Sequence, residues 1–125
     1  MATMKPAVLI VDDESVICEG LSRVLSDDFE TSYALSGKDA LDIVQRKGNI
    51  DVMLCDIKMP DMEGTEVIRK IRSVNKDMVV IVMTAVTNPK KVCEAMRYGA
   101  NNFMLKPFDI PLLTSTIRSA IKKRD

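Results

Sequence analysis

Five short segments with the composition of β-strands alternate with segments of helical periodicity along this chain. Residues 7–11, 52–55 and 78–83 are almost entirely aliphatic, with methionine and cysteine as the other members. Uninterrupted apolar runs of this length are typical of strands buried on both faces of a parallel sheet. Residues 102–105 form a shorter, mostly apolar run, whereas residues 31–35 are more polar and predict an edge strand.

Each strand-like segment is followed by apolar residues spaced three and four apart, the pattern of a helix with one buried face. Ser36 is a candidate N-cap residue and Gly48 a candidate C-cap residue for the second helix. Asn88 and Pro89 predict the start of the fourth helix, which Gly99 closes. The predicted inward-facing residues are Ile17, Leu21, Val24, Leu25, Ala40, Leu41, Val44, Val67, Ile68, Ile71, Val92, Ala95, Met96, Leu113, Ile117 and Ile121.

The alternation of five strands and five helices predicts a three-layer α/β fold. Short strand–helix–strand connections are right-handed, so consecutive strands run parallel and helices cover both faces of the sheet. Five strands favour the doubly wound, flavodoxin-like order 2-1-3-4-5. Because no linker, repeat or low-complexity segment interrupts the pattern, we expect residues 1–125 to form one domain. Its folded core should cover about residues 5–122, with the last helix fraying into the basic end.

Composition narrows the class of protein further. The 125 residues are 46% hydrophobic and 29% charged, with 18 basic and 18 acidic side chains, which gives no electrostatic footprint for nucleic acid or an anionic membrane. No apolar run approaches the roughly 20 residues of a membrane span, and the first residues lack a signal-peptide layout. We therefore expect a cytoplasmic protein in which Cys18, Cys55 and Cys93 are reduced core residues.

The candidate chemistry lies in polar residues that follow the apolar runs. The absence of histidine removes Ser–His and Cys–His catalysis and argues against zinc. Asp12 and Asp13 follow the first run, Asp56 the third, Thr84 the fourth and Lys106 the fifth. In a parallel sheet of the predicted order, ligands bind beyond the carboxyl ends of the strands, where the strand order reverses. These five residues are therefore expected to converge.

Such a group of residues suits phosphoryl transfer. Three carboxylates held together repel one another, so either one stays protonated or a hard cation binds between them. Mg²⁺ fits because it prefers oxygen ligands and combines one or two carboxylates with a phosphate oxygen. Lys106 and the Thr84 hydroxyl can bind further phosphate oxygens. A carboxylate can attack phosphorus to give an aspartyl phosphate, and Asp56 is the candidate nucleophile.

Four motifs, each at the end of a predicted strand, carry a resemblance to a known family. The chain resembles the receiver domains of response regulators in two-component signalling over essentially its whole length. Any one of the motifs is weak, whereas all four in order form a specific signal. They are Asp12-Asp13, then Asp56 with Met59-Pro60 and Gly64, then Thr84-Ala85, and lastly Lys106-Pro107-Phe108.

The resemblance implies a role for each acidic residue. Asp56 would accept a phosphoryl group from a histidine of a sensor kinase or of a histidine phosphotransfer protein. Mg²⁺ would be bound directly by Asp13, Asp56 and the backbone carbonyl of Lys58, and through water by Asp12. The domain would be a signalling module rather than an enzyme, since it would catalyse only its own phosphorylation and dephosphorylation.

The resemblance also implies a conformational switch. Thr84 and Lys106 would contact the phosphoryl oxygens, and the Lys106-Pro107 peptide bond would be cis. Phe103 stands where the family carries an aromatic residue that turns inward as Thr84 moves; as a phenylalanine on a short strand, we expect it to be hydrophobic and already buried. The fourth helix, fifth strand and fifth helix would form the output surface, with a possible homodimer through it. This surface would expose Lys90, Lys91, Glu94, Arg97, Tyr98, Arg118 and Lys122.

Alternative functions fit the residues less well. A Mg²⁺-dependent phosphohydrolase with an aspartyl nucleophile typically has a second aspartate two positions later as acid and base, where this chain has Lys58. A flavin-binding module needs a glycine- and hydroxyl-rich loop after the first strand, where Asp12 and Asp13 would repel a flavin phosphate. Because neither Lys58 nor Val86 can orient an attacking water, we predict slow self-hydrolysis of the aspartyl phosphate.

Overall fold

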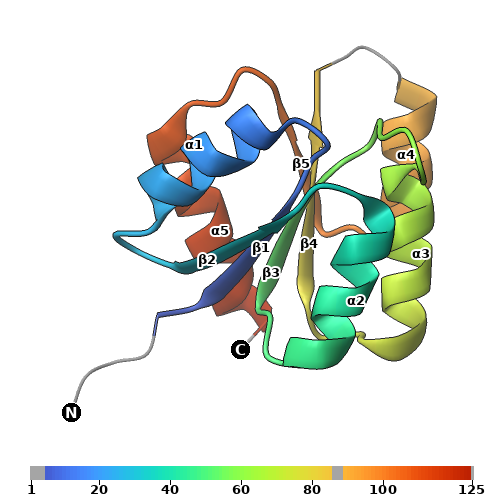
Figure 1. Ribbon diagram of the computed structural model, residues 1–125, viewed down its shortest axis with the longest axis horizontal. Coiled ribbons are helices and arrows are strands. Elements are labelled where there is room, and N and C mark those ends of the chain that lie inside the picture. The colour runs from blue at the N-terminus through green and yellow to red at the C-terminus, as the bar shows by residue number, and fades with distance from the viewer. Residues whose placement is uncertain (1–4, 86–88, 125) are drawn as a thin grey trace.

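The computed structural model describes residues 5–85 and 89–124, and these form a three-layer α/β structure (Figure 1). The sheet is parallel throughout, with the strand order β2-β1-β3-β4-β5, so the predicted flavodoxin-like order is confirmed. Its strands are β1 (Ala7–Val11), β2 (Glu30–Ala34), β3 (Val52–Asp56), β4 (Val79–Thr84) and β5 (Asn102–Leu105).

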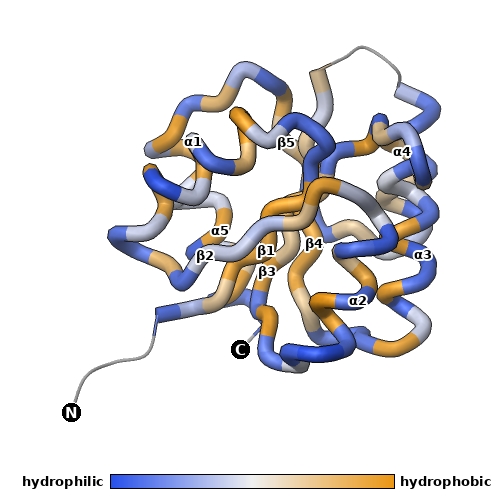
Figure 2. The backbone as a smooth tube through the Cα atoms, viewed as in Figure 1, coloured by the Kyte–Doolittle hydropathy of each residue, from blue (hydrophilic) through white to orange (hydrophobic). Residues whose placement is uncertain are grey.

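A helix follows each strand. On one face of the sheet lie α1 (Ser15–Leu25) and α5 (Ile110–Arg124), and on the other lie α2 (Gly37–Lys47), α3 (Gly64–Val74) and α4 (Pro89–Arg97) (Figure 1). Two hydrophobic clusters, one under each set of helices, sandwich the sheet. Figure 2 shows hydrophobic residues concentrated along the strands and polar residues on the outer sides of the helices.

The central strands are buried on both faces, as their composition predicts. Every residue of β3 and β4 is buried, and alternate side chains enter the two clusters. Burial of this kind removes apolar surface from water at about 25 cal/mol per Å², the main contribution that holds the layers together. Among the described residues, no helix has the length and apolar character to cross a membrane.

The local signals for α2 are confirmed. The Ser36 hydroxyl accepts a hydrogen bond from the Asp39 backbone N–H at 3.1 Å, as expected of an N-cap. Gly48 has a φ of 67°, the left-handed conformation that glycine adopts without a steric penalty. Pro89 is the first residue of α4, and the predicted cap at Asn88 lies outside the described residues.

Several predicted positions differ from the structure. The edge strand β2 begins and ends one residue earlier than predicted, which leaves Leu35 exposed. Val24, Met96 and Cys93 are exposed because they fall at the borders of their helices' apolar faces, where a spacing pattern alone assigns sides poorly. The last helix does not fray at residue 122. It continues to Arg124, whose guanidinium forms an ion pair with Asp51 at 3.2 Å.

Candidate functional site

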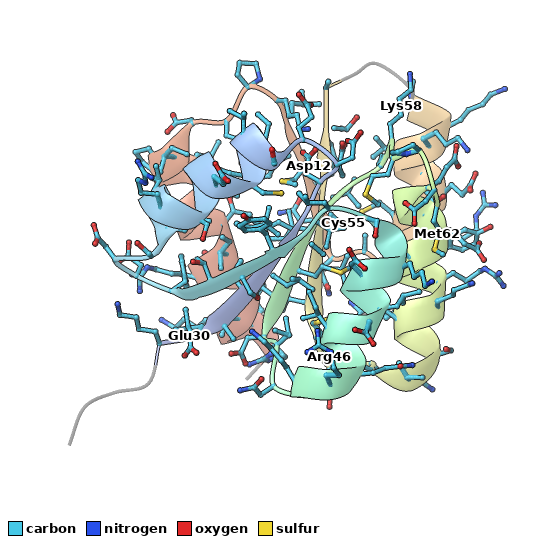
Figure 3. The ribbon with its side chains drawn as sticks, in the orientation of Figure 1. Asp12, Glu30, Arg46, Cys55, Lys58 and Met62 are labelled. Carbon is cyan, nitrogen blue, oxygen red and sulfur yellow. The ribbon has the colours of Figure 1, made fainter. Side chains whose placement is uncertain are left out.

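Two aspartates come together where β1 and β3 end. The strands pair with Val11 opposite Cys55, so Asp12 and Asp56 are the next neighbours along the same edge. Asp12 is fully buried, and Asp56 is only 7% exposed. Asp13 is exposed, yet one oxygen from each of Asp12, Asp13 and Asp56 lies within 4.8 Å of the others. Figure 3 shows Asp12 and Lys58 at this upper edge of the sheet.

Lys106 supplies the positive charge of this cluster. Its Nζ lies 2.8 Å from Oδ2 of Asp12 and 3.6 Å from Oδ2 of Asp56, so one ammonium group bridges the two buried carboxylates. The Lys106-Pro107 peptide bond is cis, as the family resemblance implies. The structure therefore brings together the residues that follow β1, β3 and β5, although they are up to 94 positions apart in the sequence.

Burial and charge act in opposite directions on the titration of these groups. Burial raises the pKa of Asp56; the charge of Lys106 opposes this, and the charge of Asp12 adds to it. Burial alone would lower the pKa of Lys106, but its hydrogen bond to Asp12 and the charge of Asp56 outweigh burial and raise it. Lys106 thus stays charged at neutral pH, whereas ionised Asp56 is held in an unfavourable environment.

The loop between β3 and α3 folds back tightly onto the acceptor strand. The Gly64 N–H donates a hydrogen bond to the Ile57 carbonyl at 2.7 Å. A Cβ added at Gly64 would lie 2.1 Å from the carbonyl oxygen of Asp56, a distance that no side chain tolerates. A glycine is therefore required here for the close approach of two backbone segments. Asp61, in the same loop, accepts hydrogen bonds from the backbone N–H groups of Gly37 and Lys38.

An open pocket of about 460 Å³ lies over Asp56. Thr84, the last residue of β4, is 7% exposed and lines it beside Lys106. The Lys58 backbone donates a hydrogen bond to the Asp56 carboxylate, while its side chain is exposed at the rim. Three carboxylates with oxygen donors at this spacing suit a hard divalent cation better than a soft one. The acidic cluster could therefore bind a metal ion.

Two pocket residues escape prediction from the sequence. Glu63, just before α3, forms an ion pair with Lys91 of α4, with 2.6 Å between Oε2 and Nζ, and both line the pocket. They lie 28 positions apart and belong to no motif, so no sequence pattern could have identified them. Cys18 also lies at the site, where its Sγ donates to the Asp12 carbonyl. Burial and the Asp12 charge raise its pKa to about 11, so its thiol is unreactive at neutral pH.

The expectation that Phe103 is buried is wrong for this conformation. Phe103 is 43% exposed, and its neighbour Leu105 is 59% exposed. On β5, an edge strand, Met104 is the one buried residue and joins the cluster under α1 and α5, whereas Phe103 and Leu105 alternate with it and face the other side of the sheet. Val86, on which the predicted slow hydrolysis partly depends, lies outside the described residues.

Comparison with known proteins gives the class of this domain. Residues 8–118 match the response regulator receiver domain, so the chain belongs to that family. Sporulation initiation phosphotransferase F of Bacillus subtilis is 36% identical over 121 residues, which are 96% of this chain and 94% of that protein. A receiver domain protein from Methanospirillum hungatei has a similar structure, with a TM-score of 0.92 at 26% identity, covering 98% of this chain and 97% of that one.

Other relatives are larger. The transcriptional regulatory protein ZraR of Salmonella typhimurium is 32% identical over 91% of this chain, and the chain spans only 26% of its length. Receiver domains are the phosphoacceptors of two-component systems and interact with histidine kinases or phosphotransfer proteins. The predicted fold, family and signalling class are therefore confirmed.

Proposed function

We propose that Asp56 is the phosphoacceptor of this domain and that Mg²⁺ is its cofactor. The observation that carries the proposal is the buried Asp12–Asp56–Lys106 cluster at the end of the acceptor strand, beneath an open pocket. An Asp56 oxygen would attack phosphorus as the P–N bond of a phosphohistidine breaks, and the electron pair of that bond would leave with the imidazole. The donor histidine belongs to a sensor kinase or a histidine phosphotransfer protein, since this chain has none.

Each neighbour of Asp56 has a distinct part in this proposal. Asp13, Asp56 and the backbone carbonyl of Lys58 would hold Mg²⁺ directly, and Asp12 would hold it through water, as the family resemblance implies. The bound cation supplies positive charge for the attacking carboxylate and the transferring phosphoryl group. Lys106, already oriented by its ion pair with Asp12, would donate a hydrogen bond to one phosphoryl oxygen, and the Thr84 hydroxyl would donate to another.

Phosphorylation would be reported by the surface of α4, β5 and α5. The movement of Thr84 toward the phosphoryl group draws Phe103 inward from its exposed position, which changes the surface around it. This surface includes exposed Lys90, Arg97 and Arg118, and it could pair with a second copy of the domain. Tyr98 is half-buried, so it contributes less to the surface than the sequence suggests.

The site favours a signalling role over hydrolysis of external phosphate esters. Lys58 stands where a phosphohydrolase needs an acid/base carboxyl group, and its exposed side chain carries no carboxyl group to fill that role. We place the domain, residues 1–125, in the cytoplasm with its donor, acting without direct contact to nucleic acid or membrane. With Lys58 beside the acceptor, the phosphoryl group should be lost slowly.

Intact mass after incubation with acetyl phosphate and Mg²⁺ tests the proposal. Wild type should gain the mass of one phosphoryl group, and Asp56→Asn should gain none. Omission of Mg²⁺ should abolish the gain, and Asp27→Asn, which changes an exposed acid before β2, should behave as wild type. An equal mass gain in Asp56→Asn would overturn the assignment of the acceptor.

A further inference from the structure

The Glu63–Lys91 ion pair spans the pocket above Asp56. It joins the loop before α3 to the first turn of α4, two elements that lie side by side in Figure 1. Glu63 Oε2 also accepts from the hydroxyl of Thr65, which is buried, so the carboxylate has a fixed partner on its own side. The pair is therefore a tether between two walls of the same pocket.

The two ends of the tether differ in how firmly they are held. The Glu63 end is fixed to the acceptor, because the adjacent Gly64 packs against the Asp56 backbone and α3 contributes five buried residues. The Lys91 end is held less firmly, because Ala95 is the one fully buried residue among Pro89–Arg97. Since little apolar packing fixes α4, an ion pair near its start has a large share in setting its position.

We propose that the Glu63–Lys91 pair is a latch that holds α4 in its unphosphorylated position and opposes occupation of the acceptor site. The proposal rests on Asp56 being the acceptor and adds two positioning residues to that reaction. A conformational change that separates α4 from the loop before α3 must break the pair. By linkage, removing the pair then raises the fraction of the domain that is competent to bind a phosphoryl group.

Because the two residues have opposite charges, their substitution can distinguish a latch from a purely electrostatic effect on the pocket. If the pair acted only through its field, loss of the Glu63 carboxylate would strengthen binding of an anion in the pocket. Loss of the Lys91 ammonium would then weaken it. A latch makes the opposite prediction for Lys91, because removing either partner releases α4. Lys91→Met is therefore the decisive variant.

The experiment measures the dissociation constant of beryllofluoride, a phosphoryl mimic, at saturating Mg²⁺ in variants of the 125-residue chain. Glu63→Gln and Lys91→Met should each bind beryllofluoride about 1.5- to 5-fold more tightly than wild type, the range expected for an exposed ion pair. The charge exchange Glu63→Lys with Lys91→Glu should restore the wild-type value, and high salt should abolish the differences. The control variant Asp42→Asn breaks an exposed ion pair with Arg46. Arg46 lies at the opposite end of the molecule from Asp12 (Figure 3), so this variant should bind beryllofluoride as tightly as wild type.

The outcomes distinguish the latch from the acceptor assignment. Weaker binding in Lys91→Met, or additive effects in the double variant Glu63→Gln/Lys91→Met, would overturn the latch. Beryllofluoride binding in Asp56→Asn as tight as in wild type would instead overturn the acceptor assignment and leave the latch without a site to control. We also expect the Glu63 and Lys91 variants, when unphosphorylated, to bind Mg²⁺ as tightly as wild type in a titration.

Discussion

The buried, charged position of Asp56 lowers the free energy of unfolding of the domain, and replacing Asp56 should show by how much. In Asp56→Asn the side chain keeps its shape but loses its charge. Without Mg²⁺ at pH 7, we expect this variant to be more stable than wild type. This result would be unusual, because most substitutions of a buried residue destabilise a protein.

The magnitude follows from the distances around the carboxylate. At an effective dielectric constant of about 20, repulsion from Asp12, whose nearest oxygen lies within 4.8 Å, is at least about 3.5 kcal/mol, and attraction to Lys106 at 3.6 Å is about 4.6 kcal/mol. Exposed Asp13 is screened by water and adds about 1 kcal/mol of repulsion. These interactions nearly cancel. The remaining contribution is the free-energy cost of desolvating the Asp56 carboxylate, which is only 7% exposed, and this cost is on the order of 1–2 kcal/mol.

The pH dependence has a definite sign. Burial raises the pKa of Asp56 above its value in the unfolded chain, so the folded state binds the proton more tightly. The destabilisation is absent below the unfolded pKa of about 3.9, grows as the pH rises from the unfolded pKa to the higher folded pKa, and is complete above the folded pKa. The stability gap between Asp56→Asn and wild type should therefore be present at pH 7 and shrink toward pH 4.

Thermal denaturation and urea denaturation, each followed by circular dichroism with and without Mg²⁺, measure this difference in stability. At pH 7 without Mg²⁺ the variant should melt about 4–8 °C higher and unfold at a higher urea concentration with the same m-value. Mg²⁺ should stabilise wild type, by about 2.7 kcal/mol at a hundredfold excess over its dissociation constant, and the variant less. Asp27→Asn makes the same change in net charge at an exposed position. If Asp56→Asn proves equal to or less stable than wild type, the acceptor is not strained by its surroundings.

Three further substitutions test the framework around the site. Gly64→Ala should destabilise the domain by about 2 kcal/mol or more, because the added Cβ would clash with the Asp56 carbonyl. It should also slow phosphorylation by acetyl phosphate. A melting temperature equal to that of wild type would contradict this backbone contact. Arg72→Met should lower the free energy of unfolding, measured by urea denaturation, by about 1–3 kcal/mol, because the guanidinium donates hydrogen bonds to the carbonyls of Gly99 and Met78, the latter just before β4. A loss of less than about 0.5 kcal/mol would show those hydrogen bonds to be dispensable. Ser36→Ala should cost about 1 kcal/mol by removing the α2 cap, whereas Ser36→Thr should retain most of it.

The sequence alone determined the sheet and the residues at its rim. Runs such as residues 52–55 and 78–83 have no polar position and are too short for a typical buried helix, so they favour strands buried on both faces, and covalent continuity places Asp56 and Thr84 where those strands end. The cap at Ser36 was equally predictable, because its hydrogen bond is made within four residues. Signals of this kind depend only on neighbours in the chain.

Tertiary structure decided what depends on packing between elements. The exposure of Phe103 depends on how other elements pack over an edge strand, which spacing within β5 does not encode. The ion pair of Glu63 and Lys91 joins the loop before α3 to α4, and the relative position of these two elements is set by side chains elsewhere. The bridging of Asp12 and Asp56 by one ammonium group likewise requires three strand ends to meet. Distances between residues far apart in the chain arise from the sum of all packing contacts, so only the folded molecule defines them.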